Sequence, residues 1–183
     1  FAHVVLVTFL FTTIFAAFEF SITFFFKFDF GLTPTQLGLI FLYIGILIAL
    51  GQGLIVRRLS SKIRERTMAL IGLASIPVPL YLLSTSPPAM GLALLALLPV
   101  ALGSALVRPA LGGLASLIVP ADRQGLALGV VRSSESLSRA VGPLAGAYLY
   151  WVFGVEGAYL LLAFALAGTF IFAMRLKNVE RKL

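Results

Sequence analysis

The sequence contains no cysteine and a single histidine, His3, in 183 residues. Without thiols the chain can form neither a disulfide framework nor a thiolate metal site. Its few carboxylates are scattered, and no nucleophile is paired with a base in a pattern typical of catalysis. We therefore expect no metal, no cofactor and no enzymatic activity. Charged residues make up only 11% of the chain, against about 25% in globular proteins, which argues against an ordinary water-soluble domain.

Apolar residues are abundant instead, since 60% of the chain is hydrophobic. Runs of about 18 or more largely apolar residues, long enough to cross a bilayer as a helix, recur along the chain. The pattern predicts an all-α membrane protein with six transmembrane helices in one domain, 1–183. Thr33 and Pro34 suit the N-cap and first position of the second helix. The predicted spans are 4–26, 36–56, 67–83, 89–119, 125–150 and 158–174.

The basic residues lie almost entirely on one side of these spans. Only Lys27 falls in a loop on the other side. By the positive-inside rule, both ends of the chain lie in the cytoplasm, and the net charge of +7 needs no nucleic acid to explain it. Tyr148, Tyr150, Trp151 and Tyr159 cluster at the opposite boundary, where aromatic rings anchor at lipid headgroups. The basic residues on the cytoplasmic side are Arg57, Arg58, Lys62, Arg64, Arg66, Arg123, Arg175, Lys177, Arg181 and Lys182.

The fifth predicted span carries charges inside an apolar segment. Arg132, Glu135 and Arg139 share one face of the helix, and Glu135 lies three residues after one arginine and four before the other. Glu135 is therefore spaced to pair with either of them, which lowers the cost of burying charge in lipid. Two interpretations remain open. The charges line an internal interface, or they lie near the cytoplasmic boundary and extend their polar ends to water.

Small residues continue the same face beyond the charges. Gly142 and Gly146 form a small-xxx-small pair, which lets a neighbouring helix approach closely. Pro143 removes one backbone hydrogen bond and favours a bend. We expect this half of the face to contact another helix.

The first and fourth spans also contain charge. Thr12, Glu19 and Thr23 share one face of the first span, with Glu19 deep in the apolar segment. An ionisable residue inside a membrane span is by default a functional hypothesis, here a cavity residue that couples ion movement. Arg108 lies inside the fourth span. The alternative is that these charges are structural counter-ions, with Arg108 paired to Glu19 or Glu135.

The third and sixth spans carry no charge, so we expect them to face lipid as the outer helices. Charge-free segments at the third and sixth positions suggest two three-helix units, and such repeats are common in secondary transporters.

Two stretches carry a resemblance to the major facilitator superfamily. "GQGLIVRRLSSKIRER" resembles the basic loop between the second and third helices of each half, with matches at Gly53, Arg58, Lys62 and Arg64. The family's acidic position is Arg57 here, a departure usual in the C-terminal half. The fifth span resembles the glycine series of the family's antiporters, with Ser and Ala replacing two glycines: Gly129, Ser138, Gly142, Pro143, Gly146 and Ala147.

The resemblance implies the C-terminal six-helix half of a twelve-helix transporter, built from two three-helix inverted repeats and similar to drug and sugar-efflux antiporters. Spans one and four would line the central cavity, spans two and five would flank the missing N-terminal half, and spans three and six would face lipid. The expected activity is proton-coupled efflux of a small molecule by alternating access. The alternative is a membrane scaffold or assembly protein without transport, in which the charges only join helices.

Overall fold

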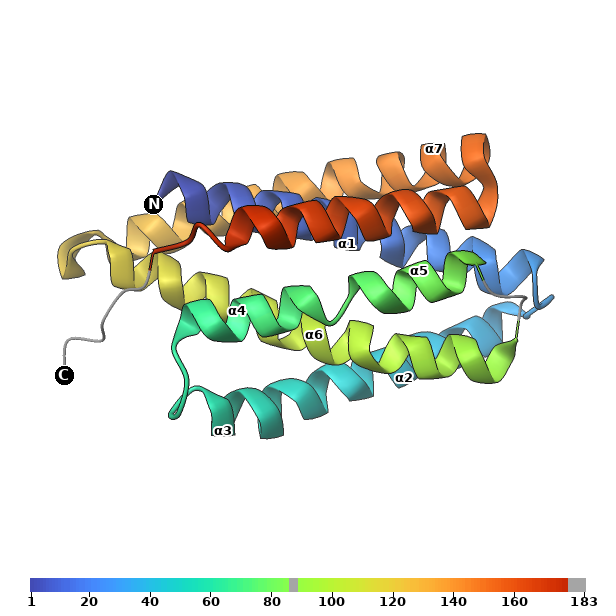
Figure 1. Ribbon diagram of the computed structural model, residues 1–183, viewed down its shortest axis with the longest axis horizontal. Helices are drawn as coiled ribbons and strands as arrows, with labels where there is room; N and C mark the ends of the chain where they lie inside the picture. Colours follow the sequence, from blue (N-terminus) through green and yellow to red (C-terminus); the bar gives the residue numbers. More distant parts are fainter. Residues whose placement is uncertain (86–88, 178–183) are drawn as a thin grey trace.

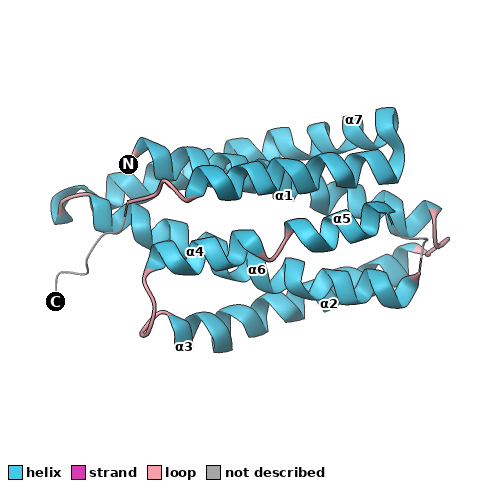
Figure 2. Ribbon diagram, in the orientation of Figure 1, coloured by secondary structure: helices cyan, strands magenta, loops and turns pink. Residues whose placement is uncertain are grey.

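The computed structural model describes residues 1–85 and 89–177, and all the regular structure in these residues is helical (Figures 1 and 2). The helices run roughly along one axis and form an elongated bundle (Figure 1). Arg181 and Lys182, part of the predicted basic tail, lie outside the described residues. Within the described residues, five helical segments are long and apolar enough to cross a membrane.

The first helix, α1, covers Ala2–Phe28 and ends at Asp29. Gly31 follows with a φ of 64°, a left-handed conformation that glycine adopts without steric cost. The next helix, α2, covers Pro34–Leu50. The Thr33 side chain accepts a hydrogen bond from the Gln36 backbone N–H, and the Gln36 side chain accepts one from the Thr33 backbone N–H. The predicted cap at Thr33 and Pro34 is therefore confirmed, as a reciprocal capping box.

The predicted second span continues past Val56, and part of it is not α-helical. After α2 the chain forms a π-helix, η1, over Gly51–Val56, and then a short helix, α3, over Arg57–Leu59. π-helical turns are rare and occur often at functional sites. The whole helical rod covers Pro34–Leu59.

The predicted third span is broken in two. Helix α4 covers Glu65–Ala74 and α5 covers Pro77–Thr85. Proline lacks a backbone N–H and disfavours helical geometry at the residue before it, so the helix restarts with Pro77 in its first position. Helix α6, Met90–Ile118, contains Pro99 and Pro109 within one assigned helix.

The final helix, α7, covers Gln124–Ala173 and follows a short 3₁₀ turn, η2, at Ala121–Arg123. Gly154 interrupts its geometry with φ 67° and ψ −171°. The orange first part of α7 and its red second part run in opposite directions (Figure 1). The predicted link between the fifth and sixth spans is thus a reversal centred on a non-helical glycine, with helix on both sides.

The core forms where α1 packs against α7, α4 against α6, and α5 against α7. Phe11, Phe15, Phe18 and Phe25 of α1 are buried there. Tyr159 is fully buried and its ring lies 5.8 Å from that of Phe18 and 5.6 Å from that of Phe25. The prediction that Tyr159 anchors at the membrane boundary is therefore wrong. An aromatic residue near a helix end suits either the membrane–water boundary or the protein core. Here the packing of α1 on α7 places Tyr159 in the core.

Of the helical segments long enough to cross a membrane, the least buried is the one that contains α2, in which only Ile44 is buried. The charge-free third and sixth spans are instead partly buried, for example at Leu73, Leu80 and Leu166. Both spans also have an exposed apolar face, for example at Val78, Phe164 and Ile171, so the expectation that they face lipid stays a prediction.

Candidate functional site

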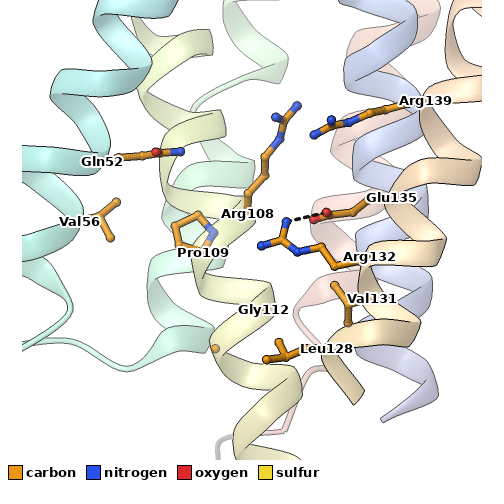
Figure 3. Close-up of a pocket in the computed structure, with 11 residues that line it drawn as sticks. Gln52, Val56, Arg108, Pro109, Gly112, Leu128, Val131, Arg132, Glu135 and Arg139 are labelled. Carbon is orange, nitrogen blue, oxygen red and sulfur yellow. Dashed lines mark hydrogen bonds and ion pairs between the residues drawn. The ribbon is translucent and has the colours of Figure 1, made fainter. Parts of the chain in front are cut away.

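A cavity of about 500 Å³ opens between η1, α6 and the first part of α7 (Figure 3). Most of its polar lining comes from α7 and α6, while η1 contributes one amide side chain. The residues that line it are Gln52, Val56, Arg108, Pro109, Gly112, Gly113, Leu128, Val131, Arg132, Glu135 and Arg139.

Helical spacing explains why these residues meet. Residues three or four apart lie on the same face of a helix, so Arg132, Glu135 and Arg139 project from one side of α7. In the same way Arg108 and Gly112 share a face of α6. The structure therefore brings together the charges of the fourth and fifth predicted spans, as Figure 3 shows.

One ion pair stabilises the α7 wall. Nη1 of Arg132 donates a hydrogen bond to Oε2 of Glu135 over 2.9 Å. The Glu135 side chain is only 8% exposed, whereas that of Arg132 is 77% exposed. Of the two partners that spacing allows, Glu135 takes Arg132. The arginine keeps its remaining donors for water or for another group.

Arg108 and Arg139 face each other across the cavity, with their guanidinium groups close together in Figure 3 and within electrostatic reach. Neither forms an ion pair with any carboxylate among the described residues. The Arg108 guanidinium lies over the Phe15 ring, 5.2 Å from its centroid, and its Nε is buried without a hydrogen-bond partner. Two unpaired guanidinium groups on opposite walls form an arrangement suited to an anion, because each presents a planar fork of donors.

Glu19 lies on α1, half-buried, outside the set of residues that line the cavity. It is within electrostatic reach of Arg108 and Arg139, although no direct ion pair joins it to either. The alternative prediction, in which Arg108 pairs directly with Glu19 or Glu135, is not met among the described residues. The charges instead surround a shared space, with three arginines and one carboxylate in its lining.

The threonines predicted to share the cavity with Glu19 do not line it. Thr12 is buried, and its hydroxyl has no hydrogen-bond partner. Thr23 is half-buried on α1. Both threonines share the α1 face of Glu19 but lie apart from the arginines.

Small residues of α7 pack directly against α1, in what we call the α1–α7 seam: Ser138, Gly142 and Gly146 against Phe9, Thr13, Ala16 and Ala17. A Cβ added at Gly142 would lie 2.6 Å from the Ala16 Cβ, and one added at Gly146 would lie 2.8 Å from the Ala17 Cα. The Ser138 hydroxyl donates to the Phe9 carbonyl oxygen over 3.0 Å. Pro143 lies within α7 and is half-buried. The seam positions the charged face of α7 at a fixed distance from α1.

The residues of the predicted loop motif lie elsewhere. Gly53, Arg58 and Lys62 line a second cavity of about 580 Å³ with Leu54, Arg57 and Ser61. Arg64 precedes α4 as its N-cap residue and is not part of this lining. We call this second space the basic corner.

Sequence reasoning missed Gln52, Gly112 and Gly113 as cavity residues. Gln52 is a polar residue inside an apolar run, and Gly112 follows Arg108 by one helical turn, so both left a signal. The π-helix that contains Gln52 left none, because its two glycines weaken an α-helix without specifying a π-helix in its place.

Comparison with known proteins gives consistent relatives. The Major Facilitator Superfamily model matches residues 4–183. Major facilitator superfamily domain-containing protein 10 from Mus musculus is 28% identical over 176 residues, covering 94% of this chain and 38% of that protein. The Homo sapiens protein is 31% identical over 159 residues, covering 84% and 33%. The crystal structure of the human organic anion transporter MFSD10 (TETRAN) aligns with a TM-score of 0.86 at 25% identity, covering 93% of this chain and 40% of that chain.

The chain therefore spans between a third and two-fifths of the length of the relatives it matches. The family match extends over almost every residue, and the solved relative shares the helical arrangement. The resemblance predicted from the loop and glycine motifs is confirmed at the level of the family. This chain belongs to the major facilitator superfamily, whose members are membrane transporters rather than enzymes.

Proposed function

We propose that this chain is the C-terminal six-helix half of a secondary active transporter. It would work by alternating access, rocking against an N-terminal half that lies outside this sequence. The length of the relatives supports the missing half, and the reversal of α7 at Gly154 supports six passes instead of five. The exposed side of α2 at Phe41, which continues the cavity side at Gln52, suits a helix that flanks the other half.

The proposed topology places the chain in the plasma or inner membrane, with both ends on the cytoplasmic side. The concentration of basic residues at one end of the bundle supports this orientation. Reporters inserted near Ser61 and fused after Leu183 should both report cytoplasm. Opposite signals from the two sites would mean an odd number of passes between them and would overturn the six-pass topology.

The substrate we propose is a small organic anion, exported from the cell. The observation that carries this proposal is the facing pair Arg108 and Arg139, with which no carboxylate among the described residues forms a direct ion pair. A carboxylate or similar group between them would accept charge-assisted hydrogen bonds from both walls. The solved relative is named an organic anion transporter, in agreement with this chemistry.

The test uses the full-length protein that contains this chain, reconstituted in liposomes with radiolabelled benzoate as the probe. Arg108→Gln and Arg139→Gln should each weaken benzoate transport at least tenfold, because a hydrogen bond to a charged group contributes about 1.5–3 kcal/mol. The control is Arg123→Gln in the η2 turn, outside the cavity. Unchanged transport in both cavity variants would overturn the anion site, and no transport by the parent protein would favour a scaffold.

Proton coupling is the second part of the proposal, with Glu19 as the group that binds and releases the proton. Its place near Arg108 and Arg139 supports a role in which substrate and proton compete for one electrostatic environment. Glu19→Gln keeps the shape of the side chain but cannot ionise. We expect it to abolish benzoate transport driven by a pH gradient while leaving benzoate exchange at equal concentrations intact. Transport against a gradient equal to that of the parent across pH 6 to 8 would exclude Glu19 as the coupling site.

A further inference from the structure

The basic corner is a cationic cavity that the transport site does not use. Arg57 and Arg58 come from α3, and Lys62 comes from the turn that follows it. All three side chains are exposed, and none pairs with a carboxylate among the described residues. The Ser60 and Ser61 hydroxyls donate to the Arg57 and Arg58 carbonyl oxygens, so local hydrogen bonding holds the turn and leaves the cations unengaged.

An apolar strip leads away from this cavity along α2. Leu54 belongs to the cavity lining and is 53% exposed. Leu50 and Ile46, one and two turns before it, are exposed to a similar extent. Over about 12 Å of helix the surface therefore changes from cationic to purely apolar. A ligand that fits both parts has an anionic head and a hydrocarbon tail.

The strip is separate from the side of η1 that lines the transport cavity. On a helix of about 100° per residue, Ile46 and Leu50 lie about 120° or more from Gln52. The packed side of α2 is a third direction, marked by buried Ile44. The strip thus faces neither the transport cavity nor the rest of this half.

The basic corner also lies at the correct depth for a headgroup. α3 is at the end of the bundle that also holds the N-terminus and the last turns of α7, opposite the reversal of α7 (Figure 1). This is where an apolar rod long enough to cross the membrane meets the water interface. Basic clusters next to membrane helices attract anionic lipids.

We propose that the basic corner binds the phosphate-bearing headgroup of an anionic membrane lipid, whose acyl chains lie along Ile46, Leu50 and Leu54. The headgroup phosphate accepts hydrogen bonds from Arg57, Arg58 and Lys62. This site is independent of the anion and proton proposals, because it needs only that the chain is in a membrane. Binding is therefore measured without transport.

The experiment uses the full-length protein in neutral detergent and native mass spectrometry to count bound lipid during titration with phosphatidylserine or phosphatidylcholine. The parent should bind phosphatidylserine more tightly than phosphatidylcholine. The triple variant Arg57→Gln, Arg58→Gln, Lys62→Gln should weaken phosphatidylserine binding about a hundredfold, because each basic residue near a lipid surface contributes about a fivefold gain. The matched control, Arg123→Gln, Arg175→Gln, Lys177→Gln, removes the same charge from the same end of the bundle and should change binding less than threefold.

If both triple variants lose phosphatidylserine binding equally, the lipid is attracted by diffuse surface charge and the proposed site is wrong. Unchanged phosphatidylserine binding in the Arg57, Arg58 and Lys62 variant would also overturn the site. Glycerol phosphate distinguishes a lipid from a free phosphate. If it displaces phosphatidylserine at equal concentration, the acyl strip contributes nothing and the lipid assignment is wrong. Leu50→Asn with Leu54→Asn should weaken phosphatidylserine but not glycerol phosphate. If the triple variant does not fold, photoactivatable phosphatidylserine should label 46–62 in the parent, and labelling elsewhere alone would overturn the proposal.

Discussion

The first part of α7 has two surfaces, the α1–α7 seam and the cavity surface, which differ in side-chain size, in charge and in distance from the neighbouring helix. On the α1–α7 seam the side chains are small, and the two backbones nearly touch at Gly142 and Gly146. On the cavity surface the side chains are long and charged, and α6 stands far enough away to leave about 500 Å³. The first surface is in direct contact with α1, and the second borders an open space lined by charged side chains. The comparison implies that the seam determines folding, whereas the cavity surface determines what the protein binds.

The largest expected effect tests the seam. Gly146→Leu would place side-chain atoms where the Ala17 backbone lies, and backbone cannot move aside as a flexible side chain can. Overpacking of this kind costs about 3 kcal/mol or more. We expect the full-length variant to lose most of its folded, monodisperse protein on size-exclusion chromatography. Leu144→Ile, at a position 73% exposed on the opposite face, should behave as the parent. Equal yields of folded protein from Gly146→Leu and Leu144→Ile would show that the seam does not determine folding.

A smaller effect is expected on the cavity surface, and it should appear in binding instead of folding. Glu135→Gln removes the one carboxylate from the cavity lining and frees Arg132. Anion binding should then tighten about fivefold, which corresponds to about 1 kcal/mol of added attraction near a protein surface. Isothermal titration with benzoate measures it, and the melting temperature should change little because Arg132 is largely exposed. Weaker benzoate binding with an unaltered melting temperature would contradict the proposal that the positive charge of the cavity surface binds the anion.

The smallest effect concerns a single hydrogen bond of the seam. Ser138→Ala removes the donor to the Phe9 carbonyl oxygen. Hydrogen bonds between membrane helices contribute about 0.6 kcal/mol on average, so unfolding in a detergent titration should shift by about that amount. Ser136→Ala on an exposed part of α7 is the matched control. A shift greater than about 2 kcal/mol would show that the bond, rather than the glycines, holds the helices together.

The sequence predicts the parts of this fold that depend on local chemistry. Capping at Thr33 follows from side-chain hydrogen bonding to nearby backbone, and the helix content follows from the length of the apolar runs. The small-residue face of α7 meets a neighbouring helix because only small side chains permit that approach. These features need no knowledge of how distant segments are arranged.

Features that depend on the rotation of one helix against another are not available from the sequence. The charges of α7 are regular in spacing, yet only the rotation of α6 determines that Arg108 meets Arg139 rather than Glu135. Tyr159 is in the core because α1 presents Phe18 and Phe25 to it. Apolar composition alone does not reveal the exposure of α2, since 34–56 is as apolar as the helices that pack inside. The place of the second span beside the missing half came from the resemblance and stays a prediction.

The turn at Gly154 has a practical consequence for anyone who handles this protein. Proteases and inserted tags need an exposed, extended segment of several residues. At Gly154 the chain reverses at a single non-helical residue with helix on both sides, so this end of α7 offers no such segment. The turn between α3 and α4, over residues 60–64, is a true connection between helices. Epitope tags, labels and cleavage sites are therefore better tolerated at that turn than at the reversal of α7, and a fragment cut there would retain both parts of α7 as one piece.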